Sequence, residues 1–174
     1  MAIIGHARLG REPRDRMRDS LRTGMAFGMT SGVITTTGLM VGLHAGTHSR
    51  VAVIGGILTI AIADAFSDAL GIHISEESDR SHTTRQVWAS TLSAFASKLL
   101  LALTFLVPVL LLDLSTAMLV SAAWCLAVLT GMSFVIARSQ GEGPLRVIAE
   151  HLAIAVIVII ATHFAGRLIA SLPA

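Results

Sequence analysis

Five long apolar segments, separated by short polar connections, are the feature that most limits how this chain can fold. A helix rises 1.5 Å per residue, so a segment of about 20 residues spans the hydrocarbon core of a bilayer. The segments run from Gly24 to Leu43, from Val51 to Ile74, from Val87 to Leu112, from Leu114 to Ala137 and from Val147 to Ile169. Only 14% of the residues are charged, well below the share in soluble domains. The sequence therefore predicts an all-α integral membrane protein with five transmembrane helices.

The distribution of arginine predicts the orientation of these helices, because cytoplasmic segments of membrane proteins are rich in Lys and Arg. With a cytoplasmic N-terminus, ten of the twelve arginines lie on the cytoplasmic side, and only Arg50 and Arg167 lie outside. We expect residues 1–22 to form a basic cytosolic N-terminal segment and residues 23–174 to form the five-helix domain. Membrane orientation explains the basic residues, so they give no reason to expect nucleic acid as a partner.

Motifs of soluble enzymes are absent from the sequence. It contains no HExxH, no GxSxG, no P-loop and no Rossmann fingerprint. The single cysteine, Cys125, excludes an intramolecular disulfide and a cysteine-based metal framework. We therefore expect neither an enzyme nor a bound cofactor.

Two acidic residues interrupt the second apolar segment. Asp64 and Asp68 are four residues apart, which places both carboxylates on one face of a helix. A charged side chain at the centre of a bilayer costs at least ~2.5 kcal/mol, so two on one face require a function or a partner. One interpretation is a cation site, since carboxylates are hard oxygen ligands. The other is a structural pairing with Lys98, which lies inside the third segment.

The first segment carries two stripes of glycine and a run of threonines. Gly24, Gly28 and Gly32 form one stripe, and Gly38, Gly42 and Gly46 form another that is rotated onto a different face. Each stripe predicts a groove that accepts a neighbouring helix at close range. Between them lie Thr35 and Thr36, whose hydroxyls either complete the cation path or bond back to the helix carbonyls.

Acidic residues also gather where the second segment ends. Glu76, Glu77 and Asp79 follow the aspartates at the cytosolic end, with His73 and His82 nearby. Carboxylate and imidazole together suit Fe²⁺, Mn²⁺ or Zn²⁺. The sequence therefore predicts either a metal-attracting entrance or an ordinary solvated acidic run.

Three stretches resemble the vacuolar iron transporter family. They are "FGMTSGVITTTGLMVGLHAG" in the first segment, "AIADAFSDALGIHISEESD" in the second and "GPLRVIAEHLAIAVIVIIATHFAGRLIA" in the last. The chain differs from the family where Phe27-Gly28 replaces an Asp-Gly pair, so its carboxylates are on the second helix. It also lacks the long glutamate-rich cytosolic insert of many members. The resemblance implies a short prokaryotic-type member in the cell membrane, acting as a homodimer that moves Fe²⁺ or Mn²⁺ out of the cytosol.

These observations lead us to expect a divalent metal cation transporter. Asp64, Asp68, Thr35 and Thr36 would line its path, and Glu76, Glu77 and Asp79 would attract cations at its entrance. Exchange for protons is one mode of coupling, and a channel or uniporter is the other. The alternative from a different class is a non-transporting membrane scaffold, in which Asp64, Asp68 and Lys98 only lock helices together. An intramembrane enzyme is the least favoured class.

Overall fold

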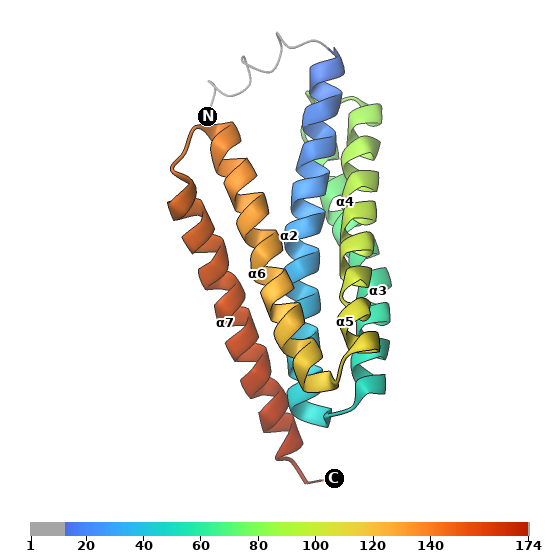
Figure 1. Ribbon diagram of the computed structural model, residues 1–174. Coiled ribbons are helices and arrows are strands. Elements are labelled where there is room, and N and C mark those ends of the chain that lie inside the picture. The colour runs from blue at the N-terminus through green and yellow to red at the C-terminus, as the bar shows by residue number, and fades with distance from the viewer. Residues whose placement is uncertain (1–12, 174) are drawn as a thin grey trace.

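The computed structural model describes residues 13–173, which form helices and no strand (Figure 1). The helices are α2 (Pro13–Thr47), α3 (Arg50–Ser78), α4 (Thr84–Thr104), α5 (Leu106–Leu111), α6 (Leu114–Gln140) and α7 (Pro144–Ala170). The long helices run alternately up and down the bundle, so the start of α2 and the end of α7 lie at opposite ends. Residues 1–12 of the basic N-terminal segment lie outside the described residues, and from Pro13 onward the segment belongs to the same helix as the first span.

Local sequence explains where the helices begin and end. The Ser49 hydroxyl accepts a hydrogen bond from the Ala52 N–H at the start of α3, and the Asp113 carboxylate accepts one from the Thr116 N–H at the start of α6. Gly141 ends α6 in the left-handed conformation, with φ of 71°. Pro144 follows in the first turn of α7, where its missing N–H costs nothing.

The third apolar segment is interrupted near its end. It was expected to form one helix from Val87 to Leu112, but α4 ends at Thr104 and α5 begins at Leu106. Pro108 explains the break, because proline has no N–H to donate and its ring crowds the carbonyl four residues earlier, at Thr104. The two pieces still form one span-length unit, from Thr84 to Leu111.

Helix α2 is the centre of the bundle and packs against α3, α4, α6 and α7 (Figure 1). Its two glycine stripes each accept a helix, as predicted. A methyl group at Gly24 or Gly28 would collide with backbone carbonyl oxygens of α4. The second stripe faces α7, where a methyl group at Gly42 would lie 3.3 Å from the Thr162 carbonyl oxygen. The stripes therefore determine which helices are the nearest neighbours of α2.

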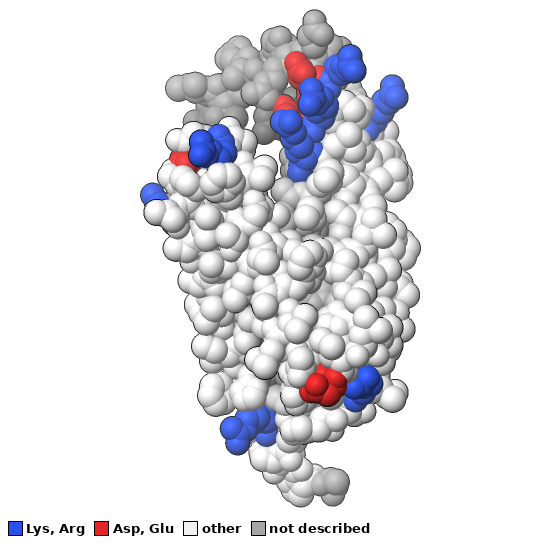
Figure 2. Space-filling view, in the orientation of Figure 1, with Lys and Arg blue, Asp and Glu red and all other residues white. Residues whose placement is uncertain are grey.

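The outer surface of the bundle is suited to lipid. Within residues 13–173, five helical units are long and apolar enough to cross a membrane, which is the number of such helices that the sequence predicts. Large apolar side chains point outward, among them Val51 and Leu119, which are 80% and 74% exposed. On the face seen in Figure 2, charged residues gather at the two ends and leave an uncharged band between them.

Candidate functional site

A buried lysine joins three helices in the middle of the bundle. Lys98 on α4 is 1% exposed, and its Nζ lies 2.5 Å from Asp64 Oδ2. The same ammonium donates to Asp68 Oδ2 and, at 2.8 Å, to the Ser31 hydroxyl on α2. We call Asp64, Asp68 and Lys98 the carboxylate–lysine triad. The structure thus brings both aspartates to one cation, Lys98. This is the pairing expected if the aspartates have a structural role.

The positions of small residues explain why these helices can meet around a lysine. The aspartates are one turn apart on α3, beside a buried row of alanines at 61, 65 and 69. On α2, a methyl group at Gly32 would lie 3.2 Å from the Lys98 Cγ, so the glycine leaves room for the lysine stem. Ser31 is next to Gly32 and therefore reaches the ammonium. No motif singles out Ser31 in the sequence, where its one distinguishing feature is its place between Gly28 and Gly32 of a stripe.

The triad holds unequal numbers of opposite charges. Counted formally at one unit each, two carboxylates and one ammonium leave one net negative charge, and the three groups differ in access to the surface. The side chain of Lys98 is 1% exposed, whereas those of Asp68 and Asp64 are 17% and 26% exposed. The surplus negative charge is therefore on the accessible side of the triad. A second cation approaching from that side would be attracted to it.

A groove in the outer surface reaches one of the aspartates. It has a volume of about 600 Å³ and lies between α2 and α3. Its walls are mostly apolar, including Leu39, Leu43 and Ile60, and its polar groups come from Thr59, Asp64 and Ser67. Asp64 therefore faces the lysine on one side and the groove on the other.

The two threonines of the predicted path are not bonded to the triad. The Thr35 hydroxyl donates to the Ser31 carbonyl oxygen at 2.9 Å. It therefore bonds back to a carbonyl of its own helix, one of the two roles that the sequence predicts. Thr36 is 1% exposed, and its hydroxyl has no hydrogen-bond partner in the described part of the chain. The structure therefore gives neither threonine a contact with the aspartates, and their role in a path stays a prediction.

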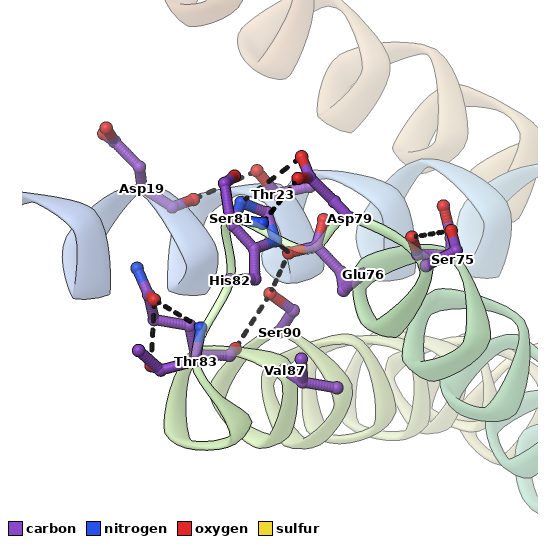
Figure 3. Close-up of polar contacts among 12 residues, drawn as sticks. Asp19, Thr23, Ser75, Glu76, Asp79, Ser81, His82, Thr83, Val87 and Ser90 are labelled. Carbon is purple, nitrogen blue, oxygen red and sulfur yellow. Dashed lines mark hydrogen bonds and ion pairs between the residues drawn. The ribbon is translucent and has the colours of Figure 1, made fainter. Parts of the chain in front are cut away.

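The acidic residues at the end of α3 surround a second polar site (Figure 3). The Glu76 carboxylate lies 3.0 Å from His82 Nδ1 and accepts a hydrogen bond from the Ser90 hydroxyl at 3.1 Å. Asp79 lies at the edge of this site, with its Oδ2 4.0 Å from His82 Nε2. Glu77 is exposed, and His73 instead bonds to Thr91 at 3.0 Å.

Glu76 and His82 also line a pocket of about 680 Å³ at this end of the bundle. Arg16 and Arg22 line it too, so the pocket carries both signs of charge. Within residues 13–173, no three His, Cys, Asp or Glu side chains are grouped so that they could hold a metal ion. Of the three residues predicted to form an entrance, Glu76 lines this pocket and Glu77 and Asp79 do not, and their role in attracting cations stays a prediction.

Comparisons of the chain with protein-family models, with curated proteins and with solved structures give no match. Membership of the vacuolar iron transporter family stays a prediction that rests on the stretches quoted above. The functional proposal therefore rests on the chemistry of the triad. Two carboxylates that share one ammonium can exchange that cation for another, provided the ammonium is able to leave or lose its proton.

Proposed function

We propose that this protein is an integral membrane transporter for a divalent metal cation, Fe²⁺ or Mn²⁺, which it moves out of the cytosol. Asp64 and Asp68 are the ligands in this proposal, and Lys98 is the resident cation that occupies them between transport cycles. The observation that supports it is the triad, with its surplus negative charge on the side that opens toward the groove. Carboxylate oxygens are suitable ligands for Mn²⁺ and Fe²⁺.

In this mechanism the metal ion and the Lys98 ammonium compete for the same oxygens. Two carboxylates balance one divalent ion only if Lys98 is neutral, so binding of the metal releases the lysine proton. Return of a proton to Lys98 then restores the ammonium and displaces the metal. Exchange of metal for proton follows from this competition, since the metal ion and the ammonium repel each other and share the same two carboxylates.

The orientation proposed from the arginines agrees with this direction of transport. The described arginines at the end of the bundle where α2 begins are those at positions 14, 16, 18, 22, 80, 85, 138 and 146. Placing that end in the cytosol makes the Glu76 pocket the entrance. Glu76, Glu77 and Asp79 then raise the local concentration of cations before they reach the triad.

A homodimer is part of the proposal, and its surface is the outer face of α3. Helices of the same chain occupy both glycine stripes of α2, so a second copy must use another face. Along α3, small residues recur every four positions on the exposed side, namely Gly55, Thr59, Ala63, Ser67 and Gly71. Methyl groups at Gly55 and Gly71 would meet nothing within 4 Å. Small residues at this spacing allow close helix contact in lipid, and this contact would enclose the groove at Asp64.

Uptake of Mn²⁺ by proteoliposomes tests the proposal. Asp64→Asn and Asp68→Asn should each slow uptake about tenfold or more, because losing a charged ligand costs upward of ~1.4 kcal/mol. Glu150→Gln is the matched control, since Glu150 forms an exposed ion pair with Arg146 far from the triad. Unchanged uptake in the double Asp variant would overturn the proposal.

The second candidate is the membrane scaffold, and one observation favours it. Lys98 already has three partners, so the triad is complete as a structural lock without any transported ion. A scaffold predicts no flux of Fe²⁺ or Mn²⁺ in the wild-type protein. It also predicts that changes in the triad alter the stability of the fold and nothing else.

A further inference from the structure

Two histidines meet at the end of the bundle opposite the arginine-rich end. His44 is in the last turn of α2, and His48 follows the end of that helix. Their ring centroids are 5.3 Å apart, with 57° between the ring planes. The His48 N–H donates to the His44 carbonyl oxygen at 3.0 Å, so the backbone also ties the two residues together.

The backbone of His48 is in a conformation that few non-glycine residues adopt. Its φ of 52° makes it the only non-glycine residue with positive φ within the described range. Glycine or asparagine is the usual residue where a helix ends in this left-handed conformation. Strained positions of this kind are found preferentially at functional sites. Histidine, like asparagine, is enriched at positive φ, so the backbone tolerates it here, and the turn places its ring beside that of His44.

Neighbouring residues hold the turn in place. The Ser49 N–H donates to the Thr47 hydroxyl at 3.2 Å, and the Ser49 hydroxyl caps α3. Arg50 follows directly after this turn, and its guanidinium donates a hydrogen bond to the Leu112 carbonyl oxygen at 2.7 Å. The turn that presents His48 is thus fixed at both sides.

The distance between the two rings suits a shared metal ion. Two imidazoles that bind one tetrahedral ion through nitrogens at about 2.1 Å have ring centroids about 5 Å apart. His44 Nδ1 is buried and has no hydrogen-bond partner among the described residues, so this nitrogen lacks the bond that a buried polar atom requires. His163 on α7 interacts electrostatically with His44, but within residues 13–173 it is not grouped with the pair as a third ligand.

We propose that His44 and His48 bind one late first-row divalent ion, such as Zn²⁺, Ni²⁺ or Cu²⁺. Imidazole nitrogen is the preferred ligand for these ions, in contrast to the carboxylates of the triad. Water completes the coordination, because no three ligating side chains are grouped within residues 13–173. The site is separate from the triad, and it does not depend on the proposed function.

Equilibrium dialysis of Zn²⁺ against the purified full chain in detergent tests this site. The measurement uses the Lys98→Met/Asp64→Asn/Asp68→Asn background, which removes the carboxylates of the triad without leaving a buried charge unpaired, so that its result is independent of metal binding there. We expect one Zn²⁺ per chain, with affinity reduced about tenfold or more by His44→Gln and by His48→Gly. His151→Gln is the control, because that ring bonds to Ser133 at the other end of the bundle and should leave affinity unchanged.

His48→Gly separates loss of binding from loss of folding. Glycine adopts positive φ freely, so this variant should keep or raise the melting temperature while it loses Zn²⁺. Binding that is unchanged in His48→Gly, or no binding by the parent chain at millimolar Zn²⁺, would overturn the site.

Discussion

The Lys98 ammonium lies 2.5 Å from Asp64 Oδ2, although the two residues come from different helices and differ greatly in exposure. Lys98 is 1% exposed, whereas the Asp64 side chain is 26% exposed and borders the groove between α2 and α3. The ion pair therefore connects the interior of the bundle to its surface. This position lets the pair serve either as a lock between helices or as a site where one cation replaces another.

Removing the charge of Lys98 should destabilise the fold strongly. Lys98→Met leaves Asp64 and Asp68 with no counter-charge, and loss of one partner of a buried ion pair costs about 3–5 kcal/mol. The thermal midpoint in detergent should fall accordingly. Adding Asp64→Asn and Asp68→Asn to Lys98→Met should recover much of the loss, because the site is then neutral. A triple variant as unstable as Lys98→Met alone would show that packing of the lysine stem, and not charge, is what matters.

The glycines of α2 and α3 should respond in opposite directions to alanine. A methyl group at Gly28 would collide with the Ala94 carbonyl oxygen, whereas one at Gly71 would meet nothing. Gly28→Ala should therefore cost about 1–3 kcal/mol through overpacking against α4. Gly71→Ala should stabilise the monomer by about 0.5–1 kcal/mol, because alanine favours the helix. Equal effects on the thermal midpoint would contradict the packing of α2 on α4.

Much of the fold could be predicted from the sequence, because the signals were strong and local. Long apolar runs predict spans, and the glycine spacing predicts two grooves on α2, which α4 and α7 fill. The break at Phe105 was missed although Pro108 signals it, because the apolar run continues on both sides. Lys98 was recognised as a partner for the aspartates, but its simultaneous contact with Asp64, Asp68 and Ser31 depends on the placement of three helices.

The remaining parts of the site depend on tertiary contacts that no spacing reveals. Ser31 reaches Lys98 only because α2 and α4 approach closely at Gly32. Glu76 meets His82 and Ser90 through the turn between α3 and α4, whereas Glu77, its neighbour in sequence, is exposed. Glu76 and Glu77 therefore have different surroundings, although the sequence shows them only as members of one acidic run.

Asp113 should make a small contribution to stability that is lost in acid. The hydrogen bond from the Thr116 backbone N–H holds the pKa of this carboxyl below its ordinary value of 3.8. A lowered pKa in the folded state means that the contribution is present above the ordinary value and disappears as the pH falls through the folded value. The charge of Asp113, at the start of α6, is also favourable there.

Asp113→Asn isolates this effect, because asparagine caps a helix as well as aspartate does but does not ionise. The difference in thermal midpoint between wild type and variant should shrink as the pH falls below about 4. Since Asp113 lies in an exposed turn between spans, the difference should be small at every pH. A difference that grows in acid would contradict the cap.

Cysteine crosslinking should detect the homodimer proposed at the outer face of α3. Cys125 is the only native cysteine, so Cys125→Ser provides a background in which Ala63→Cys carries the single thiol. In a two-fold dimer, a residue near the axis faces its own copy, and a disulfide forms when the Cα atoms are about 4.4–6.8 Å apart. We expect Ala63→Cys to crosslink in the membrane on mild oxidation. Ile160→Cys on α7 is the control, since Ile160 is 50% exposed and its exposed neighbours one turn away, Val156 and Phe164, are large. Crosslinking that is absent from Ala63→Cys, or equal at both positions, would exclude α3 as the dimer surface.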